Sequence, residues 1–271
     1  MGQSERLARL RLILGDAGLA ALGGSTVMVV GLGGVGASCA EALARGGVGS
    51  LIVLDADVVE ESNINRQALA FYSTIGRTKT DVMRDMIADI NPDCIVHSQQ
   101  VFLTWENHAH VFAAFPRTDY VIDCIDTISQ KLAIAEWCAR HEVPLVASMG
   151  AANKLDPCQL EFADIQQTGN CPMSTVVRRQ CQRYGIENLE VLYSRERPVR
   201  IERAGAASND GATSKAETLG SMSYMPPVMG QMLAGLVIRR LAGMTPIPTP
   251  PRIRQHADKR TDTQQRESAQ S

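Results

Sequence analysis

The feature that most constrains the fold of this 271-residue chain is an apolar run, Thr26–Val30, followed at once by a glycine-rich turn. The run is short and rich in β-branched residues, which predicts a buried parallel strand. The glycines of the turn are Gly31, Gly33, Gly34 and Gly36, with a Gly-x-Gly-x-x-Gly spacing among them. Such glycines permit a tight turn, admit a phosphate to bare backbone, and let the next helix pack closely on the strand. We therefore expect a phosphate at the N-terminus of a helix over 35–45.

An acidic residue follows the glycines at a characteristic distance. A strand predicted over 50–55 ends at Asp55, where Rossmann folds place the carboxylate that holds ribose hydroxyls. We assign Asp57, two residues further on, to the same site. These features suit a nicotinamide dinucleotide as well as they suit ATP. A glycine-rich turn without a ligand is the plain alternative, which the complete context of strand, turn, helix, strand and Asp disfavours.

A polar cluster after Asp55 favours a nucleoside triphosphate over a dinucleotide. Its side chains are those of Asn63, Asn65, Arg66 and Gln67. Amide and cationic donors of this kind are what the β- and γ-phosphates of a triphosphate need. Lys79 then falls in the first turn of a helix that we expect to end at Asn91-Pro92. Because the helix dipole disfavours a cation there, Lys79 is interpreted as a ligand-binding residue.

On these residues the chain resembles the ATP-dependent, ubiquitin-activating-enzyme superfamily, which includes the ThiF, MoeB and HesA proteins and whose smaller bacterial members activate carboxylates by adenylation. The resemblance implies that Gly33 lies at the phosphates and that Asp55 holds the ribose. It implies also that Asn63 and Arg66 face the phosphates and that Lys79 neutralises them. Asp126, in the run Asp123-Cys-Ile-Asp126, is implied to help hold the magnesium-bound nucleotide. The implied catalytic residues are thus Arg66, Lys79 and Asp126, with Asp126 also the metal ligand.

The chain beyond Asn91-Pro92 alternates between strand-like and helix-like patterns. We expect strands over 94–101, 119–124 and 144–149, and helices near 105–115 and over 129–141. This alternation predicts an α/β fold, a Rossmann-like, doubly wound and mainly parallel sheet with flanking helices. Asp123 and Asp126 would lie at the carboxyl end of a strand, where such sheets bind ligands.

The second half of the chain narrows the resemblance to one branch. The runs that carry it are Gly150-Ala-Ala-Asn153-Lys154-Leu-Asp156-Pro157, Phe162-Ala-Asp164-Ile and Cys171-Pro-Met173. They resemble the enzymes that dehydrate threonylcarbamoyladenosine in tRNA, although Met173 replaces the usual leucine. The resemblance covers residues 4–243 and includes an expected final strand and helix from 221 onward. It implies adenylation of the carboxylate of N6-threonylcarbamoyladenosine by ATP and cyclisation with loss of water. ATP, Mg²⁺ and a monovalent cation are the implied cofactors.

Three other functions remain open at this stage. The first is adenylation of the C-terminal glycine of a ubiquitin-like sulfur-carrier protein, whose activating enzymes usually carry paired Cys-x-x-Cys motifs for zinc that this chain lacks. Cys171, before Pro172, is the best candidate for a thioester nucleophile, but we favour a helix-capping role. The second is a nicotinamide-dependent oxidoreductase, which would share only the glycines and Asp55. The third is a non-enzymatic tRNA-binding module.

Composition limits the partners and the compartment. A net charge of −2 argues against a general electrostatic nucleic-acid binder, and we expect no DNA partner. Local contact with RNA phosphates would use a run of arginines, which a solvated charged face explains about equally well: Arg178, Arg179, Arg183, Arg195, Arg197, Arg200 and Arg203. We expect tRNA as the substrate, a homodimer, and a sulfur-relay or cysteine-desulfurase partner. Seven scattered cysteines and no secretory signal predict a cytoplasmic protein.

The chain is predicted to form one domain and a tail. Residues 1–245 would be the ATP-binding adenylating domain, with a surface excursion over 195–218. Residues 246–271 are polar and interrupted by prolines, which predicts a disordered tail. The uncharged stretch 219–238 is interpreted as a buried strand and a core helix that could form a dimer interface. Peripheral membrane association of that stretch is the lesser alternative.

Overall fold

The computed structural model describes residues 5–201 and 219–254, which are organised around one sheet of seven strands in the order β3-β2-β1-β4-β5-β8-β6. The strands are β1 Thr26–Val30, β2 Ser50–Asp55, β3 Ile95–Gln100, β4 Tyr120–Asp123, β5 Leu145–Ser148, β6 Leu160–Asp164 and β8 Glu190–Ser194. Every neighbouring pair is parallel except β6 with β8. The predicted fold class, a doubly wound and mainly parallel sheet, is therefore confirmed.

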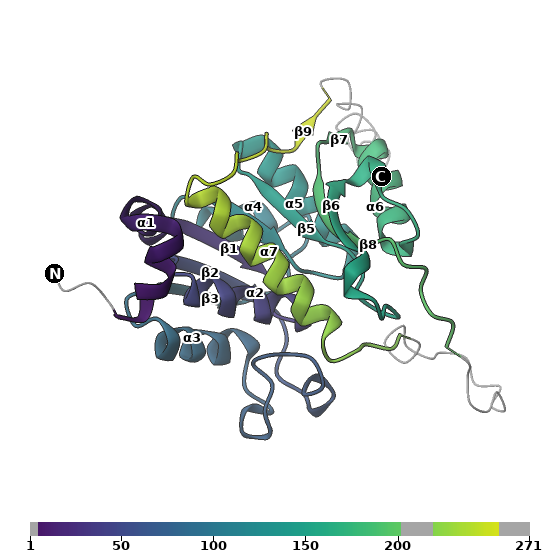
Figure 1. Ribbon diagram of the computed structural model, residues 1–271. Coiled ribbons are helices and arrows are strands. Elements are labelled where there is room, and N and C mark those ends of the chain that lie inside the picture. The colour runs from purple at the N-terminus through teal and green to yellow at the C-terminus, as the bar shows by residue number, and fades with distance from the viewer. Residues whose placement is uncertain (1–4, 202–218, 255–271) are drawn as a thin grey trace, which may run out of the picture.

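Helices cover both faces of the sheet, and the strand sequences explain why. Alternate side chains of β1 enter two separate cores, Val27 and Val29 on one face and Met28 and Val30 on the other. The helices are α1 Ala8–Gly23, α2 Gly34–Arg45, α3 Lys79–Ile90, α4 His108–Ala113, α5 Ile128–His141, α6 Pro172–Tyr184 and α7 Met225–Leu241. The first three and α7 pack on the Val27 face, and α4, α5 and α6 pack on the Met28 face. Figure 1 shows α7 running across the front of the sheet beside α2, with α4 and α5 behind.

The strand order reverses between β1 and β4, and this reversal determines where a ligand can bind. The chain leaves β1 toward β2 on one side, whereas β4 and β5 continue on the other side. The loops after β1 and β4 therefore separate to opposite faces and leave a crevice at the carboxyl ends of the strands. The glycine-rich turn and the run Asp123 to Asp126 both lie at that edge.

Helices α2 and α7 approach each other unusually closely, and Gly230 makes that approach possible. A Cβ built on Gly230 would lie 2.2 Å from the carbonyl oxygen of Val35 and 2.9 Å from the backbone nitrogen of Cys39. A Cβ on Gly34 would lie 2.7 Å from the Cβ of Pro226. The N-terminal half of α7 is thus packed directly on the helix that follows the glycine-rich turn.

The structure adds to the sequence-based picture or departs from it in three places. The helix α1 runs to Gly23 through a kink at Gly15, which adopts φ 68° and ψ 176°. The expected strand over 221–224 does not form. The carbonyl of Ser221 accepts a hydrogen bond from the side chain of Asn65 instead of from a described neighbouring strand. Strands β6 and β8 were not anticipated, because their pairing joins segments about thirty residues apart.

The expected tail is also partly ordered. Strand β9 (Arg252–Ile253) pairs antiparallel with β7 (Ile186–Glu187), and the backbone N–H of Arg254 donates to the carbonyl of Gly185. The expectation of disorder from residue 246 onward is therefore wrong for this stretch, because a distant segment supplies hydrogen bonds that local composition does not reveal. Residues 202–218 and 255–271, with Arg203 among them, lie outside the described part of the chain. None of the described helices is both long enough and apolar enough to cross a membrane.

The α2–α7 contact yields a prediction on stability. Gly230→Ala should lower the free energy of unfolding by about 1–3 kcal/mol, because the new methyl group has no space between the two helices. Gly235→Ala is the matched control in the same helix. No atom lies within 4 Å of a Cβ there, so alanine should leave stability unchanged or raise it by about 0.5–1 kcal/mol. Urea unfolding measures both, and equal effects of the two substitutions would contradict the close packing.

Candidate functional site

The glycine-rich turn has the geometry that a phosphate-binding loop requires. Gly31 has φ 89°, a value that side chains disfavour. A Cβ on Gly36 would lie 1.7 Å from the carbonyl oxygen of Gly31, so only glycine lets α2 begin this close to β1. Gly33 caps α2 in an extended conformation, and no atom lies within 4 Å of where its Cβ would be. Gly33 therefore borders open space at the N-terminus of α2, whereas Gly31, Gly34 and Gly36 are needed for packing.

Asp55 connects this turn to the end of β2. Its Oδ2 accepts a hydrogen bond from the backbone N–H of Leu32 at 2.5 Å, and its Oδ1 accepts one from the N–H of Asp57 at 2.8 Å. The Asp55 side chain is 8% exposed. Burial raises the pKa of its carboxyl, and the Lys79 ammonium together with the two backbone donors opposes that rise. Asp55 therefore stabilises the glycine-rich turn through its hydrogen bonds. The Asp57 carboxylate is 67% exposed and is the more accessible of the two.

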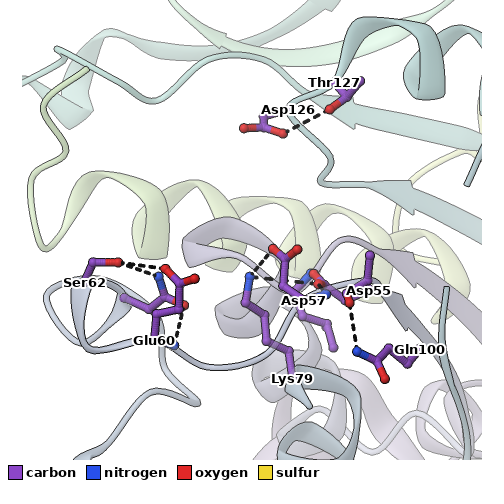
Figure 2. Close-up of polar contacts among 11 residues, drawn as sticks. Asp55, Asp57, Glu60, Ser62, Lys79, Gln100, Asp126 and Thr127 are labelled. Atoms are coloured by element: carbon purple, nitrogen blue, oxygen red, sulfur yellow. Dashed lines mark hydrogen bonds and ion pairs between the residues drawn. The ribbon is translucent and has the colours of Figure 1, made fainter. Parts of the chain in front are cut away.

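Lys79 lies at the base of a cavity next to these carboxylates. Its Nζ is 2.7 Å from Oδ2 of Asp57 and 3.9 Å from Oδ1 of Asp55, and its side chain is 6% exposed. The cavity has a volume of about 360 Å³ and is lined by Ala56, Asp57, Val58, Glu60, Asn63 and Lys79. Figure 2 shows the Lys79 ammonium directed at Asp57, with Glu60 and Ser62 on the adjoining turn. The sequence placed Lys79 beside the nucleotide loop but did not reveal its two acidic neighbours.

Arg66 reaches the glycine-rich turn from a different segment. The position of a Cβ on Gly34 would be 3.3 Å from Cγ of Arg66, so the arginine stem lies against the start of α2. Its Nη1 donates to the carbonyl of Ser62 and to Oδ1 of Asn65. The structure thus brings Arg66 and the helix N-terminus together, as a phosphate site requires.

The three amides predicted for this site are largely engaged by the protein. Asn65 receives the Arg66 hydrogen bond and donates through Nδ2 to the carbonyl of Ser221 at 3.2 Å. Asn63 is buried, accepts from the N–H of Glu60, and still lines the cavity. Gln67 is buried, and its Oε1 has no hydrogen-bond partner among the described residues. Nucleotide contact by these amides stays a prediction.

Asp126 lies on the loop after β4, apart from the Asp55, Asp57 and Lys79 cluster (Figure 2). Its side chain is exposed and accepts a hydrogen bond from the Thr127 hydroxyl at 3.5 Å. The described residues contain no group of three or more His, Cys, Asp or Glu side chains that could hold a metal ion alone. The sequence did not single out Lys131, which pairs with Asp123 behind this loop. The pattern that could have revealed Lys131 is a lysine in the first turn of a helix that follows a strand ending in Asp. Lys79 shows the same pattern, since its helix follows the strand that ends at Asp55.

The run 150–157, which carries the resemblance to one branch of the family, is held to neighbouring segments through Lys154. Lys154 is buried and donates through Nζ to the carbonyls of Asn170, Ser194 and Glu196. Burial lowers the pKa of its ammonium, and the nearby Cys171 and Glu196 oppose that shift. The Cys171 sulfur accepts from the backbone N–H of Ser174 at the start of α6, which is the capping role expected for it.

Comparison with known proteins gives concordant matches. A model described as the ThiF family matches residues 4–271. A tRNA threonylcarbamoyladenosine dehydratase of Bacillus subtilis is 40% identical over 242 residues, which cover 88% of this chain and 94% of that protein. The crystal structure of Escherichia coli tRNA N6-threonylcarbamoyladenosine dehydratase in complex with ATP matches with a TM-score of 0.78 and 28% identity, covering 88% of this chain and 94% of that one. An adenylyltransferase and sulfurtransferase MOCS3 of Drosophila virilis is 36% identical over 149 residues, 54% of this chain and 32% of that protein.

The different surroundings of two glycines give a prediction on ligand binding. Gly33→Ala should keep the thermal midpoint of the parent protein, because the residue has an ordinary extended conformation and free space. Its methyl group should nevertheless weaken ATP binding by about tenfold or more, the scale of one lost hydrogen bond to a charged group. Gly36→Ala should instead destabilise the fold itself. Thermal unfolding and calorimetric ATP titration separate the two effects, and normal ATP affinity in Gly33→Ala would mean that phosphate does not approach this turn.

Proposed function

The chain belongs to the ThiF family, and from this membership and its nucleotide site we propose that it is an ATP-dependent tRNA threonylcarbamoyladenosine dehydratase. The observation that carries the proposal is the similarity to the Bacillus subtilis dehydratase, which extends over 94% of that protein. The similarity to the sulfurtransferase covers 32% of its length, which is why adenylation of a sulfur-carrier protein is the second candidate. The ATP bound in the Escherichia coli structure supports ATP as the nucleotide.

The reaction begins with attack of a carboxylate on ATP. The carboxylate of N6-threonylcarbamoyladenosine attacks the α-phosphorus, pyrophosphate leaves, and an acyl adenylate forms. An internal group of the threonylcarbamoyl unit then attacks the activated carbonyl and closes a ring as AMP leaves. The nucleoside has lost one water, and ATP has become AMP and pyrophosphate. The protein contributes position and charge neutralisation, because no group of its own needs to become covalently attached.

The side chains around the crevice have distinct tasks in this proposal. The open backbone at Gly33 and the N-terminus of α2 receive phosphate, with Arg66 against the same helix start. Asp55 and Asp57 hold the ribose, with Asp57 the more exposed. Lys79 stabilises phosphate charge once it exchanges Asp57 for a phosphate oxygen.

Magnesium fits Asp126 as a single carboxylate ligand. Mg²⁺ in nucleotide sites is usually held by one or two carboxylates together with the phosphates, and Asp126 is an exposed carboxylate at the crevice edge. When bound, the ion would neutralise phosphate charge. No described residue is assigned to a monovalent cation, and no step depends on one.

Partners other than tRNA are also proposals. A homodimer was expected through the stretch 219–238, yet much of α7 is buried against α2. The exposed side chains of Leu12 and Ile13 on α1 offer an alternative apolar surface for a second copy. A sulfur-relay or cysteine-desulfurase partner finds no specific support in the described residues. A substrate that is cellular tRNA favours a cytoplasmic location.

Removal of the arginine at the phosphate site should slow adenylation. Arg66→Ala is expected to reduce turnover by about 10²- to 10⁴-fold with an unchanged fold, since a donor that stabilises phosphate charge is lost. Arg77→Ala is the matched control, because Arg77 is also a nearby cation but is exposed and pairs with Asp85. AMP release in the presence of modified tRNA measures turnover. Equal activity of the two variants would show that the phosphates lie elsewhere.

The substrate can be tested directly. Incubation with ATP, magnesium and tRNA that carries threonylcarbamoyladenosine should reduce the mass of the nucleoside by one water, as measured by mass spectrometry. Binding of tRNA should weaken steeply with salt if arginines contact its phosphates. An unchanged nucleoside, combined with ATP–pyrophosphate exchange that depends on a glycine-ended carrier protein, would favour the second candidate function instead.

A further inference from the structure

An ion pair lies completely buried behind the loop that carries Asp126. The Nζ of Lys131, the fourth residue of α5, donates to Oδ2 of Asp123, the last residue of β4, at 3.1 Å. Both side chains are 1% exposed. Neither has a role in the reaction described so far.

Stability alone is a poor reason for such a pair at this place. A buried ion pair is often no more stabilising than apolar residues of the same volume, because both charges lose their hydration. Burial raises the pKa of the Asp123 carboxyl, and the Lys131 ammonium opposes that rise. Lys131 also lies near the N-terminus of α5, where the helix dipole disfavours a cation. That Lys131 is buried here despite these two unfavourable effects suggests that its side chain holds a neighbouring segment in position.

The pair connects the end of β4 to the first turn of α5 on either side of this loop. The Oδ1 of Asp123 accepts from the backbone N–H of Ile125 at 3.0 Å, while its Oδ2 accepts from the Lys131 ammonium, so one carboxylate holds both the loop and the helix. Between these anchors lies Asp126, whose carboxylate is exposed. Figure 2 shows Asp126 and Thr127 together on this loop, above Asp55, Asp57 and Lys79 and apart from them.

The same connection also contacts the glycine-rich turn. The backbone N–H of Cys124 donates to the carbonyl of Val30 at 2.8 Å, and a Cβ on Gly31 would lie 3.0 Å from the carbonyl carbon of Cys124. A shift of this loop would therefore move Asp126 relative to the place where the phosphates are expected to bind.

We propose that Asp123 and Lys131 are a positioning pair for the adenylation step, which fixes the loop 124–127 so that Asp126 presents its carboxylate to magnesium-bound ATP. The inference rests on the proposed function, and it adds two residues that do not touch the substrate. Residues that orient a metal ligand typically change metal affinity by about 10- to 100-fold when they are removed. The loss should therefore appear in the magnesium-dependent part of ATP binding.

The test compares ATP binding with magnesium and with EDTA by calorimetry. Lys131→Met, which keeps the length of the side chain without its charge, should weaken ATP binding about tenfold with magnesium and less than twofold with EDTA. The double variant Asp123→Asn, Lys131→Met removes both buried charges and keeps an acceptor for the N–H of Ile125. It should recover the thermal midpoint of the parent protein but not its magnesium-dependent affinity. Recovery of both together would reduce the pair to a structural role and overturn the proposal.

Arg240→Met provides the matched control. Arg240, at the end of α7, pairs with Glu190 at the start of β8, and their side chains are 10% and 20% exposed. That pair lies at the amino end of a strand, away from the crevice at the carboxyl ends, so its loss should lower the thermal midpoint and leave magnesium-dependent ATP binding unchanged. An equal loss of binding in Arg240→Met and Lys131→Met would also overturn the proposal. If the parent protein itself binds no ATP, the proposed function fails together with the pair's role. If the parent binds ATP and the variants match it, only the pair's role fails.

Discussion

The carboxylate of Asp55 is the interaction on which the rest of the site depends. It is buried at the end of β2, and its two oxygens bind the backbone of the glycine-rich turn and the backbone of the segment that leads to Asp57. Because its glycines have no side chains, the turn is held through its backbone, and the N–H of Gly31 also donates to the carbonyl of Leu54 at 2.7 Å. A buried carboxylate that accepts two N–H groups adds to that restraint and attracts Lys79 as a countercharge. One side chain therefore connects the glycine-rich turn, the segment that leads to Asp57 and, at 3.9 Å, the Lys79 ammonium.

The side chains that line the cavity give it a net negative charge. Asp57 and Glu60 line it together with Lys79, whose charge is already compensated by Asp57 at 2.7 Å. A triphosphate without a bound cation would be repelled there by the carboxylates of Asp57 and Glu60. Arg66 and the N-terminus of α2 attract phosphate from the other end of the crevice. Under the proposed function, this balance would favour a nucleotide that enters with its own cation and has its phosphates toward the glycine-rich turn.

The sequence predicted those parts of the molecule that local patterns determine. The buried strand at Thr26–Val30, the glycine spacing and the helix start at Lys79 each follow from neighbouring residues, and all of them occur in the structure. The pairing of β6 with β8 and of β9 with β7 depends on contacts between distant segments, which periodicity does not record. At the site, residue types indicated which side chains gather. They did not indicate that Asn65 would be used to hold Arg66 and Ser221, or that Lys131 would lie buried behind Asp126.

Lys154, in the run that resembles the dehydratase branch, is engaged by the protein's own backbone. The Lys154 ammonium has three N–H donors, and three backbone carbonyls accept them, that of Asn170 before α6, that of Ser194 at the end of β8 and that of Glu196 just beyond it. Glu196 in turn accepts from the N–H groups of Leu155 and Asp156. A buried lysine whose donors are all engaged has none left for a phosphate of ATP or tRNA. Selectivity within the family would then come from the shape of the loops that Lys154 joins rather than from a contact that it makes itself.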